Sequence, residues 1–198
     1  VTASAYAASM GGSQIFLKEG VAMTVEDLLK SVIIASANDA AVALAIYCGG
    51  TVEGFAELMN DKARTLGMSG SHFVNPHGLD SPDHYSTARD MAVLSAYAMN
   101  NPIFAKTVST KSVTVGNRVL QNHNKLLWQF DGADGVKTGF TKAAGRILVS
   151  ALDYHGRTMI AVTIHDGNDW MDLDPKTLVS MNFWGFMPGY LDETEEAF

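Results

Sequence analysis

Two short polar segments, far apart in the sequence, hold the side chains best suited to chemistry. The first contains Ser36 and Asn38, in a turn between two apolar stretches. The second contains Lys137, Thr138 and Gly139, in a predicted strand. An enclosed hydroxyl and amide need hydrogen-bonding partners, so we expect them to point together into the interior or into a cleft. A lysine on a strand beside that cleft supplies positive charge, a threonine adds a hydroxyl, and a glycine lets a substrate backbone approach closely. Together these groups could hold a carboxylate.

Each segment also has a plainer explanation. Serine and asparagine between two helices are residues that helix caps prefer. A lysine on a strand is commonly just an exposed surface residue. Phe140 follows the glycine, and its backbone N–H would serve as one oxyanion donor whatever its side chain. A catalytic interpretation therefore requires the two segments to converge in space.

The pattern of apolar residues predicts helices in the first half of the chain and strands in the second. Helical spacing predicts helices over residues 24–35, 40–47, 51–66 and 87–99. Residues 1–21 are expected to be irregular, with room for one turn of helix, and residues 71–85 to form a loop. Alternation and turn residues predict a hairpin over residues 112–120, strands over residues 135–141, 145–152 and 157–164, and a closing helix over residues 174–186.

This order of elements indicates an α+β domain, with an antiparallel sheet flanked by helices, rather than alternating βαβ units. The 198 residues, of which 47% are hydrophobic and 18% charged, are enough for one sizeable core. The helix over residues 40–47 is apolar nearly all round and is expected to be buried. Cys48, at the end of that run, is expected to be a small buried hydrophobe.

Composition argues against several classes of function. The formal net charge of −7 and a pI near 5.2 make nucleic acid an unsuitable partner. No pair among the six histidines has the spacing of a helical metal site, so neither a metal nor a cofactor is expected, with His123 the one to watch. No stretch has the length of a membrane span, and no signal-peptide pattern is present.

The two polar segments, in this order, resemble the second and third signatures of penicillin-binding proteins and class A β-lactamases. Residues 36–41 are similar to the SxN element of the serine-type D-alanyl-D-alanine carboxypeptidases, the low-molecular-weight penicillin-binding proteins of peptidase family S11. Residues 134–141 are similar to the KTG strand of that family. Further similar stretches span most of the chain: residues 16–20, 77–80, 87–92 and 122–128.

The resemblance implies a β-lactamase/transpeptidase-like fold and a specific reaction. In that reaction a serine removes the terminal D-Ala of a peptidoglycan stem peptide through an acyl-enzyme, and penicillin acylates the same serine. Ser36 would relay a proton, Asn38 would position the substrate and the catalytic lysine, and Lys137 would hold the terminal carboxylate. The remaining substrate-binding residues would be Thr138, Gly139, Phe140 and His123, the last near a position where some members have arginine.

The Ser-x-x-Lys motif, which carries the nucleophile and its base in this family, does not occur in the sequence, since no lysine has serine three residues before it. The resemblance therefore implies that residues 1–190 are the C-terminal part of a D,D-peptidase domain, incomplete at the N-terminus. Residues 191–198 would begin a linker or an acidic tail. We expect the chain to be inactive alone and to need an N-terminal segment, either as a separate chain or as an absent part.

The partners implied are the peptidoglycan stem peptide and β-lactams. The complete protein is expected outside the cytoplasm, secreted or held at the outer face of the membrane, although this chain carries no signal or anchor. Two other interpretations stay open. One is a module that binds D-Ala-terminated peptides or the cell wall without chemistry, and the other is a β-lactamase, which would need a deacylating carboxylate in a loop.

Overall fold

The computed structural model describes residues 1–154 and 157–166, so the predicted helix over residues 174–186 and the tail over residues 191–198 lie outside the described residues. The helices are α1 (Ala5–Ala8), α2 (Val25–Ala35), α3 (Asn38–Gly49), α4 (Val52–Thr65), α5 (Ala88–Met99), α6 (Pro102–Val108) and α7 (Leu126–Gln129). The strands are β1 (Ser112–Val115), β2 (Arg118–Gln121), β3 (Ala133–Thr141), β4 (Gly145–Tyr154) and β5 (Arg157–Asp166). This succession confirms the predicted α+β class.

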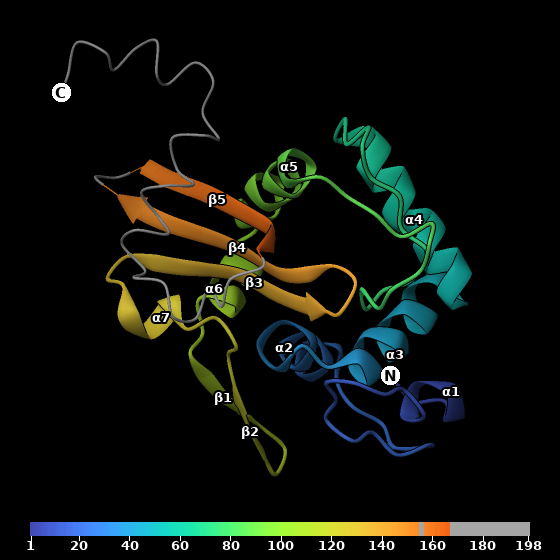
Figure 1. Ribbon diagram of the computed structural model, residues 1–198. Helices are drawn as coiled ribbons and strands as arrows, with labels where there is room; N and C mark the ends of the chain where they lie inside the picture. Colours follow the sequence, from blue (N-terminus) through green and yellow to red (C-terminus); the bar gives the residue numbers. More distant parts are fainter. Residues whose placement is uncertain (155–156, 167–198) are drawn as a thin grey trace, which may run out of the picture.

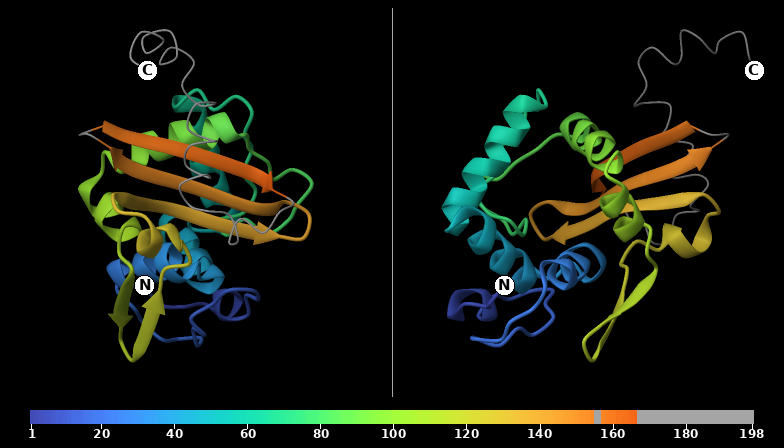
Figure 2. Two further views of the ribbon diagram at one scale, coloured as in Figure 1. Left: turned by 60° about the vertical axis from the view of Figure 1, so that its left-hand side comes forward. Right: turned by 180° about the vertical axis from the view of Figure 1, so that it is seen from behind.

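The three long strands form an antiparallel sheet in the order β3-β4-β5, as predicted. Helices α5 and α6 cover one face of this sheet (Figures 1 and 2). A small core fills the space between them, made of Val136, Val149, Ala151 and Val162 from the strands and Val108 from α6. Strand β3 lies at the edge of the sheet, so among the described strands it pairs with β4 alone.

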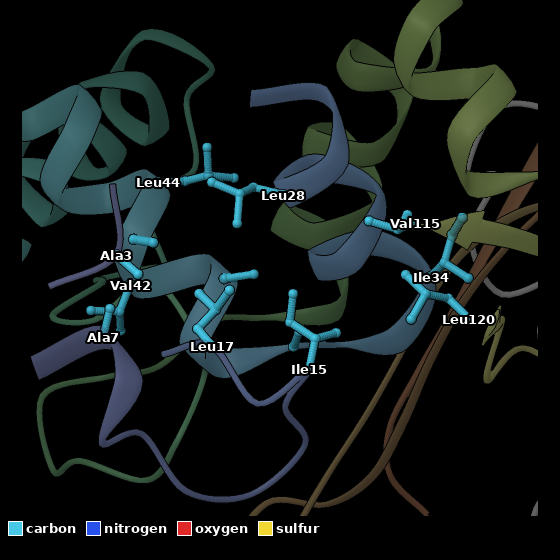
Figure 3. Packing of buried hydrophobic residues seen from close by; sticks show 13 residues of the cluster. Ala3, Ala7, Ile15, Leu17, Leu28, Ile34, Val42, Leu44, Val115 and Leu120 are labelled. Atoms are coloured by element: carbon cyan, nitrogen blue, oxygen red, sulfur yellow. The ribbon is translucent and has the colours of Figure 1, made fainter. Parts of the chain in front are cut away.

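A second core joins α1, α2 and α3 to the β1–β2 hairpin (Figure 3). It contains Leu28 and Ile34 of α2, Val42 and Leu44 of α3, and Val115 and Leu120 of the hairpin. Burying an aliphatic side chain of this size contributes about 1.5–3 kcal/mol. The cluster therefore holds the C-terminal end of α2 against both α3 and the hairpin.

Side-chain caps define where most of these helices begin. Thr24, Thr51 and Thr87 each accept the backbone N–H of the residue three positions later, at the starts of α2, α4 and α5. Asn101 does the same before α6, where proline occupies the first helical position. Helices α6 and α7 were not predicted, because seven and four residues are too few to display a helical period.

Two predictions about burial need correction. Residues 40–45 of α3 are buried as expected, but Cys48 and Tyr47 are exposed, because neighbouring elements cover only the first turns of α3. In α2 the buried residues are Leu28, Ser31 and Ile34, whereas Leu29 is 39% exposed. No single described helix has the length and hydropathy of a membrane span, and α3 and α4 reach them only together, across a bend of 81°.

A buried carboxylate attaches the loop before α2 to the start of α3. Asp39 has no solvent exposure, and its oxygens accept the backbone N–H groups of Ile15, Leu17 and Ala40 at 3.2, 2.9 and 2.9 Å. The backbone N–H of Asn38 also donates to the carbonyl of Ser13 at 2.7 Å. Because hydrogen bonds to a charged acceptor are stronger than neutral ones, this carboxylate fixes the loop beside the turn that contains Ser36.

The long loop between α4 and α5 is attached to the rest of the fold at two places. Asp90, buried in the first turn of α5, accepts the N–H of Gly70 at 2.9 Å and the hydroxyl of Ser71 at 2.7 Å. Farther along, the hydroxyl of Thr141 donates to Asp80 at 2.6 Å. In Figure 1 this loop descends from α4 toward the turn between β3 and β4, so it supports the far end of β3.

Two neutral histidines stabilise the conformation of the same loop by accepting hydrogen bonds from its backbone. The backbone N–H of Val74 donates to Nδ1 of His84 at 3.1 Å, and that of Leu79 donates to Nδ1 of His77 at 3.2 Å. A protonated imidazole has no free lone pair, so both bonds require the neutral ring. Burial, followed by the neighbouring imidazole of His84, lowers the pKa of His77, while burial and then His72 lower the pKa of His84.

Asp39→Asn tests the carboxylate anchor. The amide keeps the shape but removes the charge and turns an NH₂ group toward at least one backbone N–H, so we expect the free energy of unfolding to fall by about 2–4 kcal/mol. Urea denaturation measures this, and Glu57→Gln, at an exposed position of α4, is the matched control. Equal unfolding midpoints for both variants would show that the anchor contributes nothing.

The double variant His77→Gln, His84→Gln tests the histidine contacts. A lowered pKa means that the folded state binds fewer protons than the unfolded state, so the wild type loses stability as the pH falls from about 6.5 through the lowered values. Glutamine keeps a carbonyl acceptor but does not titrate. Between pH 7.5 and pH 5, the free energy of unfolding measured by denaturation should therefore fall more for the wild type than for the double variant. Equal decreases for the two proteins would contradict this explanation.

Candidate active site

The turn that carries Ser36 is formed by the C-terminal end of α2. Ser36 adopts the left-handed conformation, with φ 55° and ψ 36°, and the N–H groups of Ser36 and Ala37 both donate to the carbonyl of Ser31. A non-glycine residue in this conformation costs roughly 1 kcal/mol. Since α3 starts at Asn38, only two residues separate the helices, and this tight connection determines the direction of the Ser36 side chain.

The two polar segments meet in space. The ammonium of Lys137, in the middle of β3, donates to Oγ of Ser36 at 2.9 Å and to the carbonyl of Thr138 at 2.7 Å. This contact joins residues that lie 101 positions apart in the sequence. It fulfils the convergence that a catalytic interpretation requires.

Lys137 is a partly buried cation that forms no ion pair with any of the described residues. The ion pairs of Lys30 with Glu26 and of Arg64 with Asp61 do not involve it. Burial lowers the pKa of Lys137 to about 8. A desolvated ammonium of this kind favours a ligand that brings its own negative charge.

Asn38 takes a different direction from Ser36. Its amide nitrogen donates to the carbonyl of Gly11 at 2.8 Å, and only 7% of the residue is exposed. A Cβ on Gly12 would lie 2.7 Å from that nitrogen, so glycine is needed at this close approach. The structure therefore brings Ser36 and Lys137 together, while the amide nitrogen of Asn38 contacts the preceding loop.

The residues after Lys137 continue along the edge strand. Thr138 and Gly139 are partly buried, and a Cβ on Gly139 would meet only an ordinary contact, 3.6 Å from Cβ of Ile147. Side-chain space toward β4 therefore does not require this glycine. The Phe140 ring is 63% exposed, and the guanidinium of Arg146 lies 5.2 Å from its centre.

His123 precedes Asn124, whose amide donates to the carbonyl of Gly135, two residues before Lys137. Partial burial, followed by the positive charge of Lys137, lowers the pKa of His123. The imidazole also lines a cavity of about 690 Å³ that reaches the end of α2. The other lining residues are Ala35, Val119, Leu120, Gln121, Asn122, Lys125 and Trp128. Neither Ser36 nor Lys137 is among the lining residues, so this open cavity lies next to the contact between them and is not formed by it.

Sequence reasoning missed the polar residues that support this site. Asn122 and Asn124 are 8% and 0% exposed, and Asp39 is fully buried. Asp39 precedes the predicted helix over residues 40–47, where an acid also fits ordinary capping, and Asn122 and Asn124 lie in a stretch that was singled out only by its family resemblance. The part of the chain that the structure describes contains no group of three or more histidine, cysteine or acidic residues able to hold a metal.

Known proteins are similar in sequence to this chain. The family model of the D-alanyl-D-alanine carboxypeptidases, Peptidase_S11, matches residues 1–168. The chain is 41% identical over 167 residues to the D-alanyl-D-alanine carboxypeptidase DacF of Bacillus subtilis, covering 82% of this chain and 43% of that protein. It is 44% identical over 158 residues to the D-alanyl-D-alanine carboxypeptidase DacD of Escherichia coli, covering 78% of this chain and 40% of that protein.

Solved structures agree with these matches. Penicillin binding protein 5 from Haemophilus influenzae is similar with a TM-score of 0.84 and 34% identity, over 94% of this chain and 55% of that one. Penicillin binding protein 6B from Escherichia coli has a TM-score of 0.79 and 39% identity, over 85% and 56%. The chain spans less than half the length of DacF and of DacD, the two curated relatives named above. By its sequence and its fold, the chain belongs to the D-alanyl-D-alanine carboxypeptidase family, Peptidase_S11.

Proposed function

We propose that this chain is the substrate-binding and proton-relay part of a serine D-Ala-D-Ala carboxypeptidase. The reaction removes the terminal D-Ala from a peptidoglycan stem peptide through an acyl-enzyme, and β-lactams acylate the same serine. The observation that carries the proposal is the buried ammonium of Lys137, which lacks an anionic partner among the described residues and contacts Ser36. Because stem peptides lie outside the cytoplasmic membrane, we place the reaction there.

Lys137 would bind the terminal carboxylate of the substrate. The ammonium is held by a hydroxyl and a carbonyl, both uncharged, so a carboxylate would supply its missing counter-charge. His123, whose pKa the charge of Lys137 lowers, would give the carboxylate a second donor, and the hydroxyl of Thr138 a third. The edge of β3 at Gly139, which pairs with no other described strand, would accept the peptide backbone as an added strand.

Ser36 would relay a proton to the leaving D-Ala amine. Because Lys137 donates to Oγ, the hydroxyl proton of Ser36 remains free to be donated elsewhere. A pKa of about 8 leaves a fraction of Lys137 neutral near neutral pH, so the lysine can return a proton or accept one as charge moves. The backbone N–H of Phe140 would contribute one oxyanion donor.

The nucleophile is not assigned to any residue of this chain, because the sequence contains no Ser-x-x-Lys. Asn38 would position the lysine of that motif, which requires its amide to leave the carbonyl of Gly11 or to use its oxygen. Two alternative functions are distinguished by the labelling experiment below. One is binding of D-Ala-terminated peptides without chemistry, and the other is fast β-lactam hydrolysis.

Lys137→Met tests whether burial destabilises the ammonium. The pKa is lowered in the folded state, so between about pH 8 and pH 10.5 the unfolded state binds more protons and the folded state gains stability as the pH rises. Relative to Lys137→Met, the wild type should gain on the order of 1–3 kcal/mol over this range. Urea denaturation across the range measures the difference, and parallel profiles would mean that the ammonium is not desolvated.

Labelling with a fluorescent penicillin tests the proposed reaction. The 198-residue chain should remain unlabelled, whereas a chimera that adds a segment with the family's Ser-x-x-Lys motif before Val1 should be acylated. In that chimera, Lys137→Met or Ser36→Ala should slow acylation by about 10²–10³-fold. Lys62→Met, at an exposed lysine of α4, is the control and should leave the rate unchanged.

Each failure of this experiment has its own meaning. A folded chimera that binds the peptide but is never acylated would support binding without chemistry. Rapid turnover of the penicillin would support a β-lactamase. Labelling of the 198-residue chain alone would contradict the division of roles proposed here.

A further inference from the structure

Two buried asparagines flank His123 in the segment between β2 and α7. Asn122 is 8% exposed and Asn124 is fully buried, whereas the imidazole between them reaches the surface. Burial therefore alternates along this segment, with the two asparagine side chains directed inward and His123 directed outward. Polar side chains at such depth are retained only where hydrogen bonds satisfy them.

Asn122 connects this segment to the end of α6. Its amide nitrogen donates to the carbonyls of Val108 and Thr110 at 3.1 and 3.0 Å, and its oxygen accepts the backbone N–H of Asn124 at 3.0 Å. The last carbonyls of a helix have no partner within the helix. Asn122 therefore satisfies one of these carbonyls and, at the same time, fixes the backbone on both sides of His123.

Asn124 connects the same segment to β3. Its amide nitrogen donates to the carbonyl of Gly135 at 2.9 Å, and its oxygen accepts the N–H of Leu126, the first residue of α7, at 3.1 Å. Gly135 lies two residues before Lys137, where the pairing of β3 with β4 is irregular. A Cβ on Gly135 would come within 2.8 Å of Val108, so the strand, the end of α6 and the asparagines are closely packed.

We propose that Asn124, supported by Asn122, is a positioning residue that fixes the place of His123 relative to Lys137. A continuous set of buried hydrogen bonds runs from α6 through the two asparagines to the backbone of β3. The last hydrogen bond of this set runs from Asn124 to the carbonyl of Gly135. His123 is next to Asn124 in the sequence, and Lys137 is two residues after Gly135. The asparagine touches neither reacting atoms nor substrate; it acts through the two residues whose separation it sets.

This inference deepens the proposed function, because it explains how two carboxylate-binding groups from different elements are kept at one spacing. Among the described residues, Lys137 on β3 acts electrostatically on the imidazole, and Lys125 lines the same cavity as His123. Removing the charge of Lys137 should therefore raise the pKa of His123. The size of this rise depends on the distance between the two groups, which is the quantity that Asn124 is inferred to control.

The test is a double-mutant cycle on the 198-residue chain without substrate. The pKa of His123 is followed by NMR through its Cε1 proton in the wild type, Lys137→Met, Asn124→Ala and the double variant. Lys137→Met should raise the pKa of His123 in the wild-type background. In the Asn124→Ala background that rise should shrink by at least about half, because the two groups are no longer held together.

Matched variants separate positioning from general damage. Asn124→Ser leaves a smaller cavity and should give an intermediate coupling, and Asn100→Ala removes an exposed amide that also donates to a backbone carbonyl and should change nothing. Unchanged titration of His72, His77 and His84 reports that the rest of the fold is intact.

An equal rise in both backgrounds, or no rise in the wild type, would overturn the proposal. Global unfolding of both Asn124 variants would also overturn it, since Asn124 would then support the whole fold and not this pair. The cycle needs neither substrate nor acylation, so its result is independent of whether the proposed carboxypeptidase activity is correct.

Discussion

The hydrogen bond between Lys137 and Ser36 is the contact on which the site depends, because it joins two parts of the molecule with separate cores. One core holds α1, α2, α3 and the hairpin together, and the other holds α5 and α6 on the sheet (Figures 1 and 3). The strained turn at the end of α2 presents a hydroxyl, and the edge strand presents an ammonium. Neither group would bind a small peptide terminus as well alone, since each supplies only part of its charge and hydrogen bonds.

Buried polar side chains, more than apolar ones, position the loops around this contact. Asp39 holds the loop that packs against Asn38, and Asp90 holds the start of the loop that reaches β3 through Asp80. Asn124 holds the segment that carries His123. Each of these residues satisfies backbone groups that would otherwise be buried without a partner, which costs about 1–3 kcal/mol per group. Removing one such side chain therefore changes the geometry of a loop as well as the stability of the fold.

Periodicity predicted the long elements well. The helices predicted from residues 24, 51 and 87 begin one residue later, after threonine caps, and the antiparallel sheet follows the predicted strands. Burial was predicted less well. Tyr47 and Cys48 lie in an apolar run yet are exposed, because a pattern states which face a helix can bury and its neighbours decide how much of that face is covered.

By itself, the sequence determined the α+β class, the residue types available for chemistry and the family resemblance, since these follow from local spacing and motif order. Only the tertiary structure decided that Ser36 and Lys137 touch, that the amide nitrogen of Asn38 contacts Gly11, and that Asn122 and Asn124 are buried supports. Local rules cannot supply such facts, because a contact between residues 101 positions apart depends on how two cores pack. Whether an asparagine caps a helix, binds a ligand or supports a strand is likewise set by the groups that packing brings to it.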